Sequence, residues 1–207
     1  MIRGGVDTIN DVHTKSTWRR WVVLSTVLVA AWLTYVTSNI IFPGQTEPGG
    51  QIDAVVSLAP QHDRLATAEQ LFLDSGASDL LISYFPNDRY LVGPGLEEEH
   101  LEFVGTYCTS ADPTYVTCAT PEDATTLGET AMMNAAAQVE DWQALTVVTS
   151  QYHAFRTRLI LDRCLSTELQ VNVVFSEADL NVSLWLRFII YENAAYLKAH
   201  IETLMRC

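Results

Sequence analysis

The sequence predicts an α/β domain with a mainly parallel, three-layer sheet arrangement, preceded by one transmembrane helix. Three observations predict it. An uncharged stretch of 22 residues occupies positions 21–42. From residue 53 onward, short apolar runs alternate with amphipathic stretches of helical length. The chain has 207 residues, of which 48% are hydrophobic and 18% charged. That is enough for one domain with a core and an appended segment.

The uncharged stretch, WVVLSTVLVAAWLTYVTSNIIF, is the first element. About 20 apolar residues span the hydrocarbon core of a bilayer. Indole rings favour the headgroup layer, which suits Trp18 and Trp21 at one end. Three basic residues precede the stretch closely, namely Lys15, Arg19 and Arg20. No Lys or Arg follows until Arg64. The positive-inside rule therefore predicts a single-pass plasma-membrane protein with a cytoplasmic tail at 1–20, an anchor at 21–42 and the remainder extracytoplasmic.

A cleaved signal peptide is the main alternative for this stretch, since small residues at 36–38 could be a cleavage site. We favour an uncleaved anchor because the apolar run continues through Phe42. A buried helix of a soluble protein is a third alternative, which the 22 uncharged residues disfavour. Residues 43–51 read as a linker rich in Pro and Gly, and 52–207 as the domain.

The first half of the domain should hold three strands and two helices. Residues 53–59 form an apolar run of strand length, and 64–75 carry apolar residues at helical spacing that ends at Gly76. The next strand is expected at 79–84. A helix at 96–107 opens with acidic residues, which suit the positive end of its dipole. A third strand is expected at 115–119.

The second half continues the alternation. A helix at 125–142 is dominated by small residues, which allow close approach to a sheet. The most apolar strand is 145–150, LTVVTS, followed by a helix at 152–164. A fifth strand at 170–176 and a helix at 182–204 complete the domain. Such alternation argues for a mainly parallel sheet covered on both faces, and right-handed crossovers then give a Rossmann-like three-layer domain.

Charge is unevenly distributed. Residues 1–21 carry four basic and two acidic side chains, whereas the rest carries eight basic and twenty-three acidic ones. Affinity for DNA or RNA comes mainly from neutralising phosphates, so a domain this acidic is not expected to bind nucleic acid.

The four cysteines lie at positions 108, 118, 164 and 207, without CxxC or His-rich spacing, so no zinc site is expected. Cys108 and Cys118 flank the turn signal Asp112-Pro113, which favours a disulfide between them in an oxidising compartment. Two free thiols are the alternative. A Cys164–Cys207 disulfide is also possible, but we favour it less than a buried thiol at 164 and an inert one at 207.

Three loops place polar groups where ligands bind in open α/β sheets, beyond the carboxyl ends of strands. They are residues 60–64, 125–129 and 149–156. In the last, Ser150 is expected to cap the following helix, and His153 and Arg156 share a helical face. Together they could hold a phosphate or carboxylate, with His153 as a general acid or base.

Structural roles are the alternative for the same side chains. Ser150 could be only a cap, His153 structural or solvated, and Arg156 paired with an acid. Glu129 suits a helix N-terminus without any function. Two further arginines of the helix, Arg158 and Arg163, are expected to be solvated.

Three segments carry a resemblance to a known family: DRLATAEQLFLDSGA, TTLGETA and VVTSQYHAFRTRLILDRC. They resemble the YdcF/SanA/ElyC-like envelope proteins of bacteria over about residues 52–200, with YENAAYLKA giving an actinobacterial look. The resemblance implies a Rossmann-type domain behind a membrane segment and a place in peptidoglycan or lipid-linked glycan assembly. It also carries over six site positions, Arg64, Thr126, Glu129, Ser150, His153 and Arg156, without an established reaction. Our hypothesis is that His153 and Glu129 exchange protons and that Arg64, Thr126, Ser150 and Arg156 bind the ligand.

One segment departs from that family. Many members have a glycine-rich turn after the first strand, whereas this chain has Leu-Ala-Pro-Gln-His at 58–62. Proline removes an N–H donor and alanine adds a Cβ, which puts a backbone cradle for phosphate in doubt there.

The expected function is therefore binding or processing of a phosphorylated, lipid-linked envelope precursor beside the membrane, with the cofactor left open. This predicts a polar pocket that encloses Arg64, Glu129, His153 and Arg156. A non-catalytic envelope interaction module is one alternative. A binder of nucleotides or S-adenosylmethionine is another, although no GxGxxG motif is present. No GxSxG motif supports a serine hydrolase.

Overall fold

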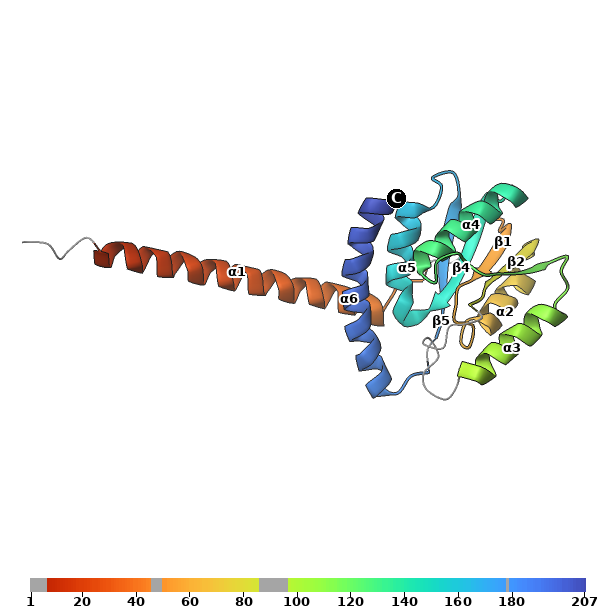
Figure 1. Ribbon diagram of the computed structural model, residues 1–207, viewed down its shortest axis with the longest axis horizontal. Coiled ribbons are helices and arrows are strands. Elements are labelled where there is room, and N and C mark those ends of the chain that lie inside the picture. Colours follow the sequence, from red (N-terminus) through yellow and green to blue (C-terminus); the bar gives the residue numbers. More distant parts are fainter. Residues whose placement is uncertain (1–6, 46–49, 86–96, 178) are drawn as a thin grey trace, which may run out of the picture. The chain divides into compact units, whose positions relative to one another are not determined.

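The computed structural model describes residues 7–45, 50–85, 97–177 and 179–207 (Figure 1). The chain divides into two compact units, Met1–Ser38 and Asn39–Cys207, and each is described by itself. Three parts of the predicted organisation lie outside the described residues: 1–6 of the tail, 46–49 of the linker, and Leu96 at the start of a predicted helix.

The N-terminal helix, α1, runs from Asp7 to Ile41. Its part Trp18–Ile41 is the one helix in the described residues that is long and apolar enough to cross a membrane. The polar side chains Ser25, Thr26 and Thr34 each donate to a carbonyl oxygen three or four residues earlier in the helix. Because their hydroxyls are satisfied within the helix, these residues are compatible with an apolar surrounding.

The second unit is built on a five-stranded, all-parallel sheet with the order β3-β2-β1-β4-β5. The strands are β1 (Ala54–Ser57), β2 (Asp79–Ser83), β3 (Val116–Ala119), β4 (Ala144–Ser150) and β5 (Gln170–Ser176). Every residue of the central strand β1 is buried. This confirms the predicted α/β, Rossmann-like class, in which strands covered on both faces are continuously apolar.

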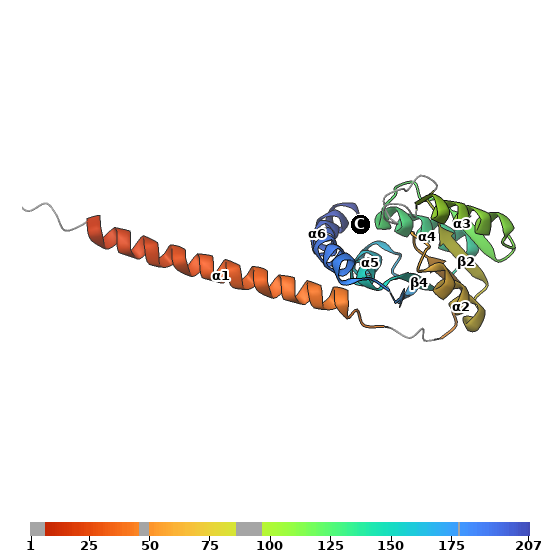
Figure 2. The same ribbon diagram turned by 90° about the horizontal axis from the view of Figure 1, so that it is seen from below.

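Helices cover both faces of the sheet (Figures 1 and 2). They are α2 (Leu65–Ser75), α3 (Glu97–Ser110), α4 (Thr126–Glu140), α5 (Gln151–Cys164) and α6 (Val182–Arg206). Side chains of β1 alternate between two core clusters. Val55 packs with residues of α2, such as Leu65, whereas Val56 packs with Met133 of α4 and Leu161 of α5. Thus α2 and α4–α5 lie on opposite faces.

Local signals explain where several helices begin and end. Gly76 ends α2 with φ 68°, a left-handed conformation that glycine adopts without strain. Thr125 begins α4, and its hydroxyl accepts a hydrogen bond from the backbone N–H of Gly128. A Cβ on Gly128 would lie 2.1 Å from the carbonyl oxygen of Asp123. The loop before α4 therefore requires glycine at this position.

Two disulfides fasten helices to their neighbours. The predicted Cys108–Cys118 bond joins the last turn of α3 to β3 and is confirmed. The bond that we favoured less, Cys164–Cys207, also forms, so the expectation of free thiols at these positions is wrong. It joins the end of α5 to the residue after α6. Persistent disulfides suggest an oxidising, extracytoplasmic environment.

Helix α6 packs beside α5 (Figures 1 and 2). The rings of Tyr152 and Phe188 stack with centroids 4.1 Å apart, and those of Phe155 and Tyr196 with centroids 4.4 Å apart. Large aromatic side chains of this kind add stacking energy to the apolar area that they bury. The contact matters for the candidate site because α6 supplies one of its charged groups.

Candidate functional site

The candidate residues gather where the sheet reverses its strand order. From β1 the chain winds to β2 and β3 on one side, and it returns to β4 and β5 on the other. The carboxyl ends of β1 and β4 are neighbours, with Ser57 opposite Val148. In open α/β sheets, such a switch point forms a crevice that binds ligands. The loop 59–64 follows β1, α5 follows β4, and α4 begins at the same edge.

The turn after β1 is held by the side chains of Glu129 and Arg64. The backbone N–H of Ala59 donates to Glu129 Oε1 over 2.8 Å. The carbonyl oxygen of Ala59 accepts from Arg64 Nη1. Because Glu129 already occupies this N–H, Ala59 does not offer it to a phosphate. The doubt raised by the missing glycines therefore has a structural basis.

Gln61 stabilises the same turn, and sequence reasoning assigned it no role. Its side chain is 2% exposed, and its Nε2 donates to carbonyl oxygens of Ser57, Leu58 and Ser83. The last of these, at 2.8 Å, links the ends of β1 and β2. A polar residue in a loop is typical of a solvated position, so only the fold reveals that Gln61 is buried.

Arg64 connects the turn after β1 to the start of α5. It is 2% exposed, and its Nε donates to Ser150 Oγ over 2.8 Å. A carboxylate oxygen of Asp63 lies 3.8 Å from the same Nε. The expectation that Ser150 caps α5 through its side chain is wrong. Ser150 occupies the N-cap position, but it makes no side-chain cap bond because its hydroxyl accepts from Arg64.

Glu129 lies in the first turn of α4 and is 3% exposed. Burial raises the pKa of this carboxyl above its ordinary value. The nearby Ser83 hydroxyl, the Ala59 N–H and the charges of Arg64 and Arg156 oppose that shift without cancelling it. Glu129 therefore holds a proton at a higher pH than a solvated glutamate does.

His153 lies in the first turn of α5, between Thr126 and Glu192. Its Nε2 is 3.3 Å from Thr126 Oγ1, and its Nδ1 is 3.6 Å from Glu192 Oε1. Burial and then the charge of Arg156 lower the pKa of His153 to about 4, and Glu192 opposes them only partly. The imidazole is therefore neutral at pH 7. The carboxylate favours the proton on Nδ1, which leaves Nε2 to accept from Thr126.

Arg156 is paired with Glu192 of α6. Its Nε and Nη2 donate to the two carboxylate oxygens over 2.8 and 2.9 Å. Burial alone would raise the pKa of Glu192, but the hydrogen bonds and charge of Arg156, with a smaller effect of His153, lower it to about 2. The fork of Arg156 is thus occupied within the protein, in agreement with the structural alternative for this residue.

Glu192 is the functional-site neighbour that sequence reasoning missed. It lies in the segment YENAAYLKA of the helix predicted at 182–204, in which sequence reasoning assigned no site residue. The available signal was helical spacing. Glu192, Tyr196, Ala199 and Thr203 lie four, three and four residues apart, and all four are buried. An acidic residue on the apolar face of a predicted helix indicates a buried partner.

Of the two arginines of α5 that were expected to be solvated, Arg163 is exposed, whereas Arg158 is half-buried, and both also make hydrogen bonds. Arg163 Nη1 donates to Thr203 Oγ1 of α6 over 2.8 Å. Arg158 Nη2 donates to the carbonyl oxygens of Val173, over 3.1 Å, and of Gly44. These bonds hold α5 against α6, β5 and the segment after α1.

The six candidate residues lie in two sets of contacts at this edge of the sheet. The first runs from Glu129 through the Ala59 backbone to Arg64 and Ser150. In the second, His153 contacts Thr126, which is in the same helix turn as Glu129, and Glu192 links His153 to Arg156. Glu129 and Arg156 also interact electrostatically. Acidic side chains, Glu129 and Glu192, and basic side chains, Arg64 and Arg156, are thus interspersed around the strand ends.

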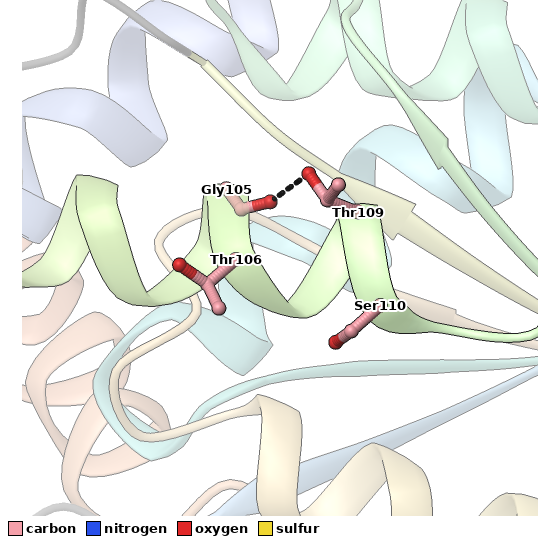
Figure 3. A pocket seen from close by; sticks show the side chains of 4 residues that line it. All are labelled: Gly105, Thr106, Thr109 and Ser110. Atoms are coloured by element: carbon pink, nitrogen blue, oxygen red, sulfur yellow. Dashed lines mark hydrogen bonds between the residues drawn. The ribbon is translucent and has the colours of Figure 1, made fainter.

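Other parts of the described chain offer less. No group of three or more His, Cys, Asp or Glu side chains in the described residues is arranged to hold a metal ion. A shallow hollow on α3 is lined by Gly105, Thr106, Thr109 and Ser110 (Figure 3). The hydroxyl of Thr109 donates to the carbonyl oxygen of Gly105 there, and the lining holds no ionisable side chain.

Comparisons with family models, curated proteins and solved structures found no match. The function is therefore argued from the geometry of the site.

Proposed function

We propose that residues 43–207 form an extracytoplasmic domain that binds a phosphorylated precursor of the cell envelope at the carboxyl ends of β1 and β4. The observation that carries the proposal is the buried guanidinium of Arg64 beside the first turn of α5. A helix N-terminus presents backbone N–H groups and a positive dipole end to an anion. An arginine at the same place adds charge and directed donors.

Arg64 keeps donors for a ligand. A guanidinium carries five N–H groups. In the described contacts Nε donates to Ser150 and Nη1 to Ala59. The nearest described carboxylate, of Asp63, lies 3.8 Å away, beyond hydrogen-bonding distance. Asp63 and Glu129 supply negative charge nearby, but the remaining N–H groups of the buried guanidinium have no acceptor among the described contacts, and a bound anion would supply one.

The same edge of the sheet holds two ionisable groups whose pKa values are shifted in opposite directions. Glu129 has a raised pKa and His153 a pKa lowered to about 4. One therefore retains a proton more readily than usual, while the other is a neutral base. Pairs whose environments separate their pKa values in this way are typical of acid–base chemistry. We assign these roles to Glu129 and His153 for a processing step that follows binding.

An envelope precursor is favoured over a cytosolic ligand by three observations. Helix α1 contains a candidate membrane span, and the domain carries two disulfides. Basic residues precede the span, which supports a cytoplasmic N-terminus. The resemblance to envelope proteins points in the same direction. Anchoring next to the bilayer raises the effective concentration of a lipid-linked ligand.

A non-catalytic interaction module is the second candidate, and one observation favours it. Arg156, Glu192 and His153 form a buried network that a structural role alone explains. In that case substitution of His153 changes stability, and no phosphorylated compound stabilises the protein.

Thermal unfolding of the full chain in detergent micelles tests the proposal. The compounds are inorganic phosphate, pyrophosphate, a short-chain polyprenyl phosphate, a nucleotide sugar and S-adenosylmethionine. A compound at 100 times its Kd stabilises the folded state by about 2.7 kcal/mol. For a domain of this size we expect this to raise Tm by about 5–10 °C. Polyprenyl phosphate should give a larger shift than phosphate at equal concentration.

Two matched substitutions locate the effect. Arg64→Lys retains the positive charge but removes the planar guanidinium donors, and it should abolish the rise in Tm. Arg187→Lys alters an exposed arginine of α6 and should leave it unchanged. Circular dichroism establishes that both variants fold. An equal shift in wild type and Arg64→Lys, or no shift with any phosphorylated compound, would contradict the proposal. A shift with S-adenosylmethionine alone would favour that ligand class instead.

A further inference from the structure

We propose that the outer face of α6 rests on the lipid surface of the membrane that holds α1. The proposal starts from an apolar surface that we call the α6 stripe. It consists of Val182, Leu186, Ile190, Leu197, Ile201 and Leu204, each at least 52% exposed. Their spacings of three, four and seven residues place them on one side of the helix. A continuous apolar surface of this length marks a binding surface.

The α6 stripe is distinct from the face of α6 that packs on the domain. That face buries Glu192, Tyr196, Ala199 and Thr203, and it contacts α5. Figures 1 and 2 show α6 beside α5 at the margin of the sheet. The helix is therefore apolar on two sides, and the described residues cover only one of them. Packing within the domain does not explain the second.

Charge is the first argument for lipid as the occupant. Eight basic residues follow residue 21, and α5 and α6 hold six of them together with three acidic residues. The remainder has two basic and twenty acidic residues. An acidic domain that gathers its cations in one layer approaches an anionic surface with that layer foremost. Anionic lipid headgroups attract Lys and Arg near the bilayer.

Two exposed cations of α6, Arg187 and Lys198, lie beside the stripe, whereas Arg206 lies nearer the face that packs on the domain. Lys198 Nζ is 3.5 Å from Glu202, and Arg206 Nη2 is 3.0 Å from Asp123. Both are exposed surface pairs, which hold their side chains only weakly, so a headgroup phosphate can compete for the cations. An apolar face with basic residues at its border is typical of helices that lie in the membrane interface.

The course of the chain is the second argument. Ile41 is the last residue of the candidate span. Within the folded unit its carbonyl oxygen accepts from Nε2 of Gln151, the first residue of α5, over 2.8 Å. The chain therefore enters the domain at the helix on which α6 packs. This bond connects the end of the span to α5, the helix next to α6.

A second copy of the chain would fit the stripe less well. In a two-fold dimer the same surface meets itself. The cationic layers of both copies would then face each other, and like charges oppose such a contact. An anionic lipid surface complements the layer instead.

Nitroxide labels on the full chain test this placement. The chain is reconstituted in vesicles of phosphatidylcholine and phosphatidylglycerol. All four native cysteines are in disulfides, so Ile190→Cys supplies a single free thiol for labelling. The matched control is Leu73→Cys on α2, across the sheet. The two side chains are 72% and 74% exposed in the domain. The label at 190 should collide more often with oxygen than with a water-soluble nickel complex, and the label at 73 should show the reverse.

Equal access of the nickel complex to both labels would overturn the proposal. So would spin–spin broadening at position 190 that vanishes on dilution with unlabelled chain, because it would identify a second copy as the occupant. A double variant, Arg187→Glu with Lys198→Glu, tests the charge argument. It should increase the access of the nickel complex to position 190, and unchanged access would contradict an anionic lipid surface. Urea unfolding in detergent establishes that the labelled variants are folded.

Discussion

The Arg156–Glu192 pair is a single contact with a large expected effect. Both donors of the guanidinium fork meet the carboxylate, and Glu192 is 2% exposed. Glu192→Gln leaves Arg156 and its charge without a compensating anion. Removing one partner of a buried pair costs about 3–5 kcal/mol of unfolding free energy. Urea unfolding of the full chain in detergent measures this loss.

Glu202→Gln on the same helix is the matched control. In the described part of the chain, Glu202 pairs with Lys198 at 3.5 Å on the surface, and exposed pairs contribute about 0–1 kcal/mol. Replacing both members of the buried pair, Arg156→Met with Glu192→Leu, should recover much of the loss because no charge stays buried. If Glu192→Gln costs no more than Glu202→Gln, the pair is solvated and the description is wrong.

The buried His153 makes the domain less stable in mild acid. Its pKa falls from the ordinary 6.5 to about 4 on folding. Between these values the unfolded chain binds the proton and the folded chain does not, so stability falls as the pH falls. The slope is at most about 1.4 kcal/mol per pH unit for one proton. Urea unfolding at a series of pH values measures it, and His153→Gln should flatten this part of the curve.

Two buried carboxyls also make the stability of the domain depend on pH, and their effects have opposite signs. Glu192 has its pKa lowered from 4.5 to about 2, so its contribution is present above pH 4.5 and lost as the pH falls toward 2. Glu129 has a raised pKa, so its contribution is present below its ordinary pKa and lost as the pH rises through the higher, folded value. A slope between pH 6.5 and 4 that survives in His153→Gln would show that His153 is not its source.

Sequence reasoning placed six side chains at one edge because strand ends and helix starts of a parallel sheet meet there. It could not place Glu192, which reaches His153 from a helix almost forty residues later. That contact depends on how α6 packs on α5, which no local pattern specifies. It also predicted that the Ser150 side chain caps α5. That prediction failed because the Ser150 hydroxyl accepts from Arg64, a contact that forms only when β1 and β4 are neighbours.

At the scale of elements, the start of α4 depends on Gly128. Alanine is normally the better helix former, by about 1 kcal/mol. Here its Cβ would lie 2.1 Å from the Asp123 carbonyl oxygen, so the loop must shift. We expect Gly128→Ala to destabilise by about 1–3 kcal/mol, as overpacking does. Chemical denaturation measures it.

Gly105→Ala in α3 is the control for that substitution. The nearest atom to its Cβ would be the Tyr84 hydroxyl oxygen at 3.7 Å, an ordinary contact. This variant should be slightly stabilised by the gain in helix propensity. Equal effects of the two substitutions would mean that the approach of residues 123 and 128 is looser than described.

The disulfide at the end of α6 should contribute more to stability than the one at α3. Loop-entropy arguments give about 4 kcal/mol for the 43-residue separation of Cys164 and Cys207, and about 3 kcal/mol for the 10-residue separation of Cys108 and Cys118. Urea unfolding of the two double Cys→Ser variants compares them. Hydrogen exchange of α6 should be faster in the variant that lacks the Cys164–Cys207 bond and not in the other. If α6 is as protected in that variant as in wild type, the bond does not stabilise α6.

The sequence predicted the type of every described strand and helix in the domain, and all of their boundaries lie within three residues of the predicted ones. Apolar runs and helical spacing are local, which explains this success. The largest difference is at the end of α3, which continues to Ser110 rather than ending at 107, and Cys108 in its last turn is bonded to Cys118 of β3. The order of the strands was not predicted, since pairing depends on contacts between distant segments.

For the molecule as a whole, an uncleaved anchor predicts that the mature protein keeps its first 38 residues. Expressed in a bacterial host, it should stay with the membrane pellet after alkaline carbonate extraction. Two charges in the middle of the span, Leu28→Arg with Val29→Arg, should release it, since each costs about 2.5–3.5 kcal/mol at the centre of a bilayer helix. Leu73→Arg, on the surface of α2, is the control. A mature N-terminus just after Ser38 would favour the signal peptide.

The position of α6 at the end of the described chain has a consequence for biosynthesis. Ribosomes deliver the chain from N- to C-terminus, so the sheet and α5 are complete while residues 182–207 are still to come. Until Glu192 has been synthesised, Arg156 lacks the carboxylate with which it pairs in the folded domain. Until Cys207 has been synthesised, the thiol of Cys164 lacks its native partner. A nascent chain that lacks residues 182–207 therefore holds an unpaired thiol at Cys164, which is open to non-native disulfide formation in an oxidising compartment.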